Sequence, residues 1–149
     1  MTSRHGLEIR TAGAAEAPGL AILLAAAGHP VEPRLLAERL EAVRQGTGTA
    51  LVALEWGPPS GLVLVHWYPS LTAARSIAQI TLLLVGVEER RRGIGRLLVK
   101  AAAQAARVAG CGALELAAPP EAPGMRQFCE ATGFTESGTR FLRSLRKGG

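Results

Sequence analysis

Aromatic residues are scarce in this sequence. They make up 4% of its 149 residues and include a single tyrosine, Tyr68. The core is therefore expected to be aliphatic and rich in alanine. The net charge of +5 suggests an acidic partner, but surfaces that bind nucleic acids usually interleave basic residues with exposed aromatic rings. Because that pattern is missing, no nucleic-acid partner is expected.

Cysteines and long apolar runs are also few. Cys111 and Cys129 form neither a Cys-x-x-Cys pair nor a metal-binding spacing, so two buried thiols in a reducing compartment are expected. No apolar run is long enough to span a bilayer. The short apolar stretch from Gly19 to Ala27 follows two glutamates and favours a helix of the mature domain over a signal peptide. A cytoplasmic protein with no membrane partner is expected.

The length and the 48% of hydrophobic residues predict one folded domain, residues 1–149. Hairpins mixed with a crossover predict a mixed sheet with helices on both faces. Strands are expected over residues 7–10, 49–55, 62–67, 77–87, 113–117 and 138–146, and helices over 14–27, from 33 to 46, 96–109 and 124–132.

One stretch, residues 82–98, organises the rest of the sequence. An apolar run ends at Val87 and is followed by charged residues, two glycines and an alanine- and leucine-rich segment, which predicts a strand, a turn and a helix. Gly93 and Gly95 would let the backbone approach a ligand closely. The first N–H groups of a helix lack helical partners and carry the positive end of its dipole. Such a turn is typical of a phosphate-binding site.

This turn, Arg90-Arg91-Arg92-Gly93-Ile94-Gly95, resembles the R-x-x-G-x-G signature of the GNAT superfamily of N-acetyltransferases. The dinucleotide fingerprint G-x-G-x-x-G does not fit, because residue 98 is leucine. The alternative interpretation of these six residues is an αβ turn whose basic tip is exposed to solvent and binds no ligand. The resemblance implies an α/β fold of the GNAT type: a mixed, mostly antiparallel sheet with a central splayed parallel strand pair and helices on both faces.

The resemblance also implies acetyl-CoA as the cosubstrate, and no metal. Its pyrophosphate would lie on the N–H groups from Arg91 to Arg96, and its pantetheine arm would pair with the central strand like an added β-strand. The acetyl carbonyl would accept a backbone N–H near Leu84 or Val85, which would serve as an oxyanion site. The cofactor-binding residues implied in this way are Leu83, Leu84, Val85, Arg90, Arg91, Arg92, Gly93, Ile94, Gly95 and Arg96.

The acid of the reaction is less evident. Many members of the family place a tyrosine in a pattern like F-Y-E-x-x-G-F, whereas the segment Phe128–Phe134 carries Cys129 at that position. Cys129 is either inert packing or a proton donor to the leaving thiolate, or another group or water replaces the acid. Tyr68 is the alternative donor, with a loop-anchoring role as its competing interpretation. The loop before this segment also lacks the asparagine that the family often uses to contact the cofactor.

Candidates for the base and for substrate binding lie near the expected hairpin. His66 is a candidate because histidine is the residue type most often used as a base near neutrality, although a lone strand histidine is more often structural. Glu55 and Trp67 are expected to contact the acceptor. Glu115 is a further candidate carboxylate, but the sequence does not decide to which face of the sheet its side chain points. Few carboxylates lie in this region, so a small amine or a peptide amine is favoured over a polycation.

The function expected from the resemblance is transfer of an acetyl group from acetyl-CoA directly to a primary amine of a small molecule, peptide or protein. The missing tyrosine and asparagine motivate an alternative, an acetyl-CoA-binding domain with a weak or regulatory role. The arginine-rich last segment leaves a homodimer open. A nucleic-acid-associated protein is a third hypothesis, supported by the charge alone.

Overall fold

The computed structural model describes residues 3–4, 6–87, 93–118 and 124–146. The chain divides into two compact units, residues 1–116 and 117–149. Among the described residues, the first unit contains strands, a short 3-10 helix and three α-helices, and the second contains one short helix. The elements are β1 (Ser3–Arg4), β2 (Leu7–Thr11), η1 (Ala14–Glu16), α1 (Ala17–Ala26), α2 (Pro33–Gln45), β3 (Gly48–Leu54), β4 (Gly61–Tyr68), β5 (Ser76–Val85), α3 (Ile94–Val108), β6 (Cys111–Leu116) and α4 (Met125–Ala131).

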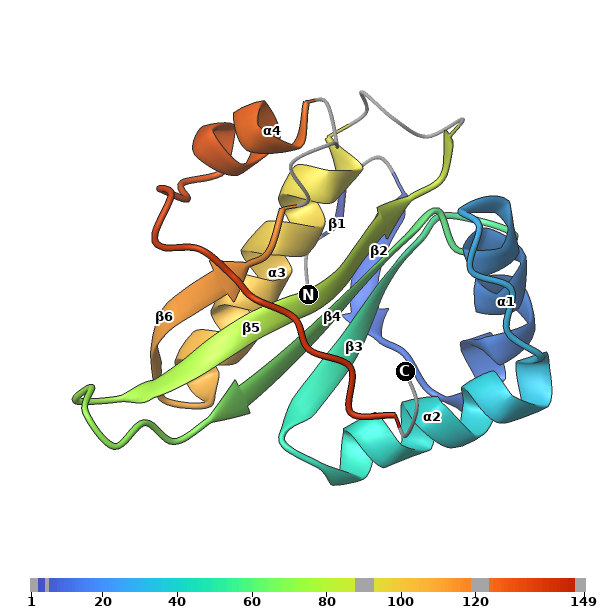
Figure 1. Cartoon of the computed structure of the whole chain (residues 1–149). Helices are drawn as coiled ribbons and strands as arrows, with labels where there is room; N and C mark the ends of the chain where they lie inside the picture. Colours follow the sequence, from blue (N-terminus) through green and yellow to red (C-terminus); the bar gives the residue numbers. More distant parts are fainter. Residues whose placement is uncertain (1–2, 5, 88–92, 119–123, 147–149) are drawn as a thin grey trace. The chain divides into compact units, whose positions relative to one another are not determined.

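The strands form one sheet in which neighbours in sequence are neighbours in space, from β1 to β6. All neighbouring pairs are antiparallel except β5 and β6, which are parallel and are connected through α3 (Figure 1). A mixed, mostly antiparallel sheet with helices on both faces was expected from the sequence and is confirmed. The parallel pair forms the last two strands of the sheet in the described residues.

Helix α3 covers one face of the sheet. Its buried residues recur at helical spacing along one side: Ile94, Leu98, Val99, Ala102 and Ala106. The contact with β4 is close, because a Cβ placed on Gly61 would lie 2.8 Å from Leu98 Cδ1 and 3.1 Å from Ile94 Cγ2. The absent side chain at Gly61 therefore lets the first turn of α3 rest directly on the start of β4.

Helices α1 and α2 cover the opposite face (Figure 1). Leu20 and Leu24 of α1 and Leu36 and Leu40 of α2 join Val52 of β3 in one buried cluster. The half-buried Leu64, Leu82 and Leu84 pack against the edge of this cluster. The two faces are thus aliphatic, as the shortage of aromatic residues predicts.

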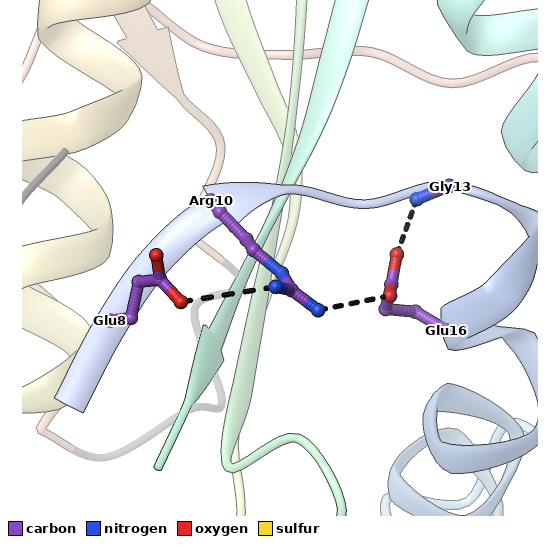
Figure 2. Close-up of polar contacts among 4 residues, drawn as sticks. All are labelled: Glu8, Arg10, Gly13 and Glu16. Carbon is purple, nitrogen blue, oxygen red and sulfur yellow. Dashed lines mark hydrogen bonds and ion pairs between the residues drawn. The ribbon is translucent and has the colours of Figure 1, made fainter. Parts of the chain in front are cut away.

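A set of polar contacts fixes the entry into α1 (Figure 2). The Gly13 N–H donates a hydrogen bond of 2.7 Å to Glu16 Oε1, which satisfies one donor at the start of η1. Arg10 on β2 lies between two carboxylates, with Nη1 3.9 Å from Glu8 Oε1 and Nη2 3.4 Å from Glu16 Oε2. These surface ion pairs contribute little stability individually, but they link the end of β2 to the first turn of the helix.

Several element boundaries differ from those expected. The expected central strand, residues 77–87, ends at Val85, and the following helix begins at Ile94 rather than at residue 96. Burial of Ile94 to 1% exposure against the sheet draws the turn residues into the helix. Strand β1 had no signal in the sequence, because it is only two residues long.

The expected last strand over residues 138–146 is wrong. These residues form neither strand nor helix in the structure. Phe141, Leu142 and Leu145 are 87–92% exposed. A strand needs a ladder partner for its backbone groups, and the apolar residues of this segment gave the appearance of a strand without one.

The second unit is ordered around α4. The Arg126 guanidinium donates to Glu136, with Nη1 2.6 Å from Oε1, and it holds the pKa of that carboxyl below its ordinary value. Thr132 Oγ1 donates to the Phe128 carbonyl at 2.8 Å, and the Phe134 N–H donates to the Cys129 carbonyl at 2.8 Å. The helix therefore ends in a tight backbone turn at Gly133, as the sequence predicts.

Candidate functional site

The two halves of β5 have different surroundings. Up to Ile80 the strand pairs with β4 on one side and with β6 on the other, and its last pair with β6 is Ile80–Leu116. From Leu82 to Val85 the only strand that pairs with it in the described ranges is β4. The register shifts at this point, because Thr81 is an extra residue between the Leu64–Leu82 and Val65–Ile80 pairs. Figure 1 shows β5 (green) running on beyond the end of β6 (orange).

The backbone groups along this open edge can be assigned from the ladder. The Gly86 N–H donates to the Ser60 carbonyl at 2.9 Å, on the side of β4. Backbone groups of alternate residues point to opposite edges of a strand, so those of Leu84 also face β4. The N–H and C=O groups of Leu83 and Val85 point to the open edge, where no strand of the described chain pairs with them.

The open half of β5 is also apolar and half-exposed on both faces. Leu82 and Leu84 lie on the side of α1 and α2, while Leu83 and Val85 lie on the side of α3, and all four are half-buried. In the other half, Ala78 is 0% and Ile80 is 2% exposed. The open edge therefore has both backbone donors and apolar surface available to an extended ligand.

The N-terminus of α3 follows this edge in sequence. Gly93 is the N-cap, with φ 79° in the left-handed region that favours glycine. The first backbone bond of the helix runs from the Leu97 N–H to the Gly93 carbonyl, so the N–H groups of Ile94, Gly95 and Arg96 have no helical partner. No side chain caps them among the described residues, and the first turn contains no acidic residue. This 15-residue helix thus presents free donors and the positive end of its dipole.

The end of β5 is held in place from the side of β3 and β4. Ser60 is buried, and both its N–H and its hydroxyl donate to the Ala53 carbonyl, at 2.9 and 3.2 Å. Its carbonyl accepts the Gly86 N–H. Together with the close contact at Gly61, this fixes the end of β5 and the start of α3 against the same loop.

The expected cofactor residues fall into three groups. Leu83, Leu84 and Val85 form the half-open strand, although the Leu84 amide faces β4. Gly93, Ile94, Gly95 and Arg96 form the cap and first turn of α3. The remaining three, Arg90, Arg91 and Arg92, lie outside the described residues.

The expected catalytic and substrate residues of the first unit do not lie together. His66, Trp67 and Tyr68 end β4, where His66 pairs with Gly48 and Gln79. Glu55 follows β3 at the other end of that strand, near the start of β4 at Gly61. The five-residue rise from Gly61 to His66 is roughly 17 Å. His66 and Tyr68 share the face of Leu64, while alternation turns Trp67 to the face of α3.

Cys129 lies on α4 in the second unit, half-buried rather than fully buried as expected, whereas Cys111 is buried. Burial raises the pKa of the Cys129 thiol, an effect that the nearby Arg126 opposes and Glu130 reinforces. The thiol is therefore protonated at neutral pH. It suits a proton donor or an inert packing residue better than a nucleophile.

Sequence reasoning missed Gln79 and left the facing of Glu115 open. The register pairs Gln79 with His66 on β4 and with Glu115 on β6, so the three side chains lie in one row on one face. Simple alternation of side chains along β5 from Leu84 would put Gln79 on the face of α3. The extra residue Thr81 shifts this alternation by one, so Gln79 lies on the opposite face. No signal in the sequence marks that bulge.

Within the described ranges, no group of three or more histidine, cysteine or acidic residues is placed to hold a metal ion. None of the helices in those ranges combines the length and the hydropathy needed to cross a bilayer.

Comparison with known proteins gives a consistent result. A profile of the acetyltransferase (GNAT) family matches residues 20–134. Among solved structures, the "Putative acetyltransferase from Agrobacterium tumefaciens str. C58" is 29% identical with a TM-score of 0.82, covering 92% of this chain and 99% of that one. A search of curated protein sequences gives no match.

Two further structures share the fold at lower identity. A transcriptional regulator from Bacillus halodurans C-125 is 22% identical with a TM-score of 0.85, covering 93% of this chain and 99% of that one. A ribosomal-protein-alanine N-acetyltransferase from Brucella melitensis biovar Abortus 2308 is 22% identical with a TM-score of 0.79, covering 94% and 99%. With an open strand edge leading into an uncapped helix, and with a family match over most of its length, this chain belongs to the acetyltransferase (GNAT) family.

Proposed function

We propose that the protein is an acetyl-CoA-dependent N-acetyltransferase that transfers the acetyl group directly to a primary amine. The observation that carries the proposal is the continuity of the open edge of β5 with the free N–H groups of α3. Family membership supports the reaction class. The acceptor and the dependence on acetyl-CoA are the parts that we propose.

The residues present fit acetyl-CoA. The N–H groups of Ile94, Gly95 and Arg96 would hold the pyrophosphate, and Gly93 and Gly95 add no side chain that would keep it away. The pantetheine amides would pair with the outward backbone groups of Val85 and then Leu83, as an added strand does. Apolar parts of the arm would cover the half-exposed side chains of the same strand.

The order of these contacts supports a position for the thioester near Leu83. A chain anchored at α3 and running back along β5 reaches Val85 before Leu83. We therefore assign the Leu83 N–H, rather than that of Leu84, as the donor to the acetyl carbonyl, because the Leu84 group faces β4. A backbone donor at that point would stabilise the oxyanion that forms when the amine attacks.

We propose two candidates for the general acid that protonates the leaving CoA thiolate. Cys129 is supported by the match of its segment to the family pattern and by a thiol that burial keeps protonated. Tyr68 is supported by its place at the end of β4, 42% exposed on the same face as His66. For the acceptor, a small amine or a peptide amine is favoured. The Brucella protein, which is named for a ribosomal-protein alanine, makes a peptide amine a reasonable first probe.

The replacement of the family's tyrosine by Cys129 supports a second candidate function, an acetyl-CoA-binding domain with a weak or regulatory role. In either case we propose a single functional domain, because the family match runs from residue 20 to residue 134 and so includes parts of both compact units. The two free thiols support the proposal of a cytoplasmic protein.

Two measurements test these proposals. Calorimetry should detect binding of acetyl-CoA and of CoA to the full chain; no binding would contradict both candidate functions. A thiol-release assay with a panel of primary amines, including peptides with a free amino-terminal alanine, should show amine-dependent release. Binding without any amine-dependent release would support the regulatory candidate and contradict the enzyme.

A further inference from the structure

An open cavity of about 620 Å³ lies at the end of the sheet where β5 and β6 begin. It is bordered by the β4–β5 loop, the starts of both strands and the last turn of α3 (Figure 1). The volume falls within the roughly 300–1,000 Å³ that is typical of small-molecule sites. Among the described residues that line it, the apolar wall is formed by Ala73, Ala74, Ile77 and Ala113, and the charged side chains are Arg75 and Arg107.

Arg75 lies across the start of β6 because Gly112 has no side chain. A Cβ placed on Gly112 would lie 3.2 Å from Arg75 Cβ and 3.5 Å from its Cδ, so the aliphatic part of the arginine rests on the glycine. Gly112 is also an extra residue in β6, between the first two pairs that β5 and β6 make. Such an irregularity re-aims the neighbouring side chains. The start of Arg75 is therefore ordered before any ligand binds.

Arg107 lines the same cavity from the last turn of α3. Part of its role is to offset the negative end of the helix dipole, which is equivalent to roughly half an elementary charge. Two guanidiniums outweigh that half charge, and no acidic residue lines the cavity among the described residues. Neither arginine has a hydrogen-bond or ion-pair partner in the described part of the chain. The cavity is therefore positively charged and lacks a counter-charge of its own there.

We propose that this cavity is a second binding site, which takes a small carboxylate with an apolar body such as a short-chain fatty acid. The carboxylate would accept hydrogen bonds from Arg75 and Arg107, since the planar guanidinium matches the geometry of a carboxylate. The hydrocarbon would cover the methyl groups of the apolar wall. Inorganic phosphate would satisfy the arginines but would leave that wall exposed to water, so it fits less well.

The site is separate from the one that we propose for acetyl-CoA. It lies at the start of β5, and Ile77 precedes Leu83 by six residues, roughly 20 Å at the rise of a strand. No residue of the proposed acetyl-CoA site lines the cavity. The inference thus goes beyond the proposed function, and binding at this site can be measured with or without CoA.

The test is an NMR titration of the isotope-labelled full chain with hexanoate, followed at the amide signals of Ile77, Gly112 and Ala113. Three further probes separate the parts of the ligand. Hexanamide keeps the shape of hexanoate without its charge, acetate keeps the carboxylate without the apolar body, and inorganic phosphate is a small anion of another class.

The matched variants are Arg75→Gln and Arg107→Gln, each of which removes one positive charge from the cavity. Arg39→Gln, at an exposed arginine on α2, is the control for the loss of a surface charge elsewhere. Hexanoate should shift the three amide signals in a saturable way and bind more tightly than any of the other probes. Each cavity variant should weaken hexanoate by about tenfold, near the lower limit for a hydrogen bond to a charged group, because both guanidiniums are exposed. Arg39→Gln should bind hexanoate as the wild type does.

The absence of a saturable shift at these amides would overturn the proposal. Equal affinities for hexanoate and hexanamide, or unchanged affinity for hexanoate in both cavity variants, would show that the arginines bind no carboxylate and would overturn it too. Acetate or phosphate binding as tightly as hexanoate would contradict the assigned class of ligand. Failure of the proposed acetyltransferase function has a different signature, the absence of acetyl-CoA binding in calorimetry, and leaves the hexanoate titration unaffected.

Discussion

The two halves of β5 are similar in sequence and different in structure. Both are mostly apolar, yet residues 76–80 are paired on both edges and residues 82–85 on one. Ala78 and Ile80 are buried in the first half, whereas Leu82 to Val85 are half-exposed in the second. The difference arises from β6, which ends at Leu116, and from the extra residue Thr81.

This comparison shows how an ordinary sheet becomes a binding site. The first half satisfies its backbone groups within the protein and contributes to the core. The second half has the same backbone donors and acceptors but leaves those of Leu83 and Val85 without a strand partner in the described chain. Unpaired groups beside apolar surface favour an extended polar ligand, because a ligand can supply both the missing hydrogen bonds and the missing cover.

The largest effects are expected from single proline substitutions in the open half of β5, because each removes an N–H from one edge of the strand only. Leu83→Pro removes an N–H that points to the open edge, a position where proline is tolerated. It should lower kcat by roughly 10²–10³-fold, the effect of losing one oxyanion donor. Leu83→Ala, which keeps the N–H, is the control in steady-state assays. A Leu83→Pro enzyme as active as Leu83→Ala would show that this amide is not used.

The same substitution one residue later should act on folding instead. Leu84→Pro removes a ladder bond to β4, as in a central strand, and should lower the thermal unfolding midpoint far more than Leu83→Pro does. If both variants unfolded at the same temperature, the assignment of the two edges would be wrong.

The proposed pyrophosphate site at the first turn of α3 can be tested by removing one backbone N–H donor. Gly95→Pro eliminates an N–H in the first turn, and α1 shows that this chain accepts proline there, at Pro18. The loss of a hydrogen bond to a charged group, about 1.5–3 kcal/mol, should weaken CoA binding by about 10–100-fold. Gly95→Ala keeps the donor and controls for the added side chain in the same calorimetric titration. Equal affinities of the two variants would argue against a pyrophosphate on this turn.

The contact that fixes α3 to the sheet should be sensitive to one methyl group. Gly61→Ala places a Cβ 2.8 Å from Leu98 Cδ1 and should destabilise the protein by about 1–3 kcal/mol through overpacking, measured by denaturant unfolding. Gly13→Ala is the control, because its nearest neighbour, Glu16 Oε1, would be 3.8 Å from the new Cβ. Unchanged stability in Gly61→Ala would mean that α3 can move away from β4 freely.

The smallest effect is expected outside the first unit, at Cys129. Burial raises its pKa, so the protonated thiol is favoured and the reactive thiolate appears only at higher pH than for an ordinary cysteine. In a Cys111→Ser background, the rate of alkylation by iodoacetamide should stay low at pH 7 and rise with a midpoint above that of free cysteine. A midpoint at or below the free value would contradict the assignment of a protonated thiol.

Much of this architecture could be read from the sequence. The glycines and the apolar run of residues 82–98 predicted a strand, a turn and a helix. The strand and the helix are confirmed as β5 and α3. Pairing could not be read in the same way. The bulge at Thr81 depends on how β4 and β5 fit together, and it decides which face Gln79 occupies.

Errors at the two ends of the chain have the same origin. Strand β1 is too short to show a pattern, and residues 138–146 are apolar in part but form no strand.

The site candidates His66 and Glu55 were expected to lie together because both flank one hairpin, yet they lie near opposite ends of its strands. Local sequence indicates that an element forms; the neighbour it meets is a tertiary property.

The central claim is that a CoA-linked arm pairs with the open edge of β5. Amide hydrogen exchange, followed by NMR with and without CoA, tests it most directly. The N–H groups of Leu82 and Leu84 should be protected in both states, because they face β4, while those of Leu83 and Val85 should exchange quickly in the free protein and become protected on binding. Protection of Leu83 and Val85 in the free protein, or no change when saturating CoA is added, would contradict the account.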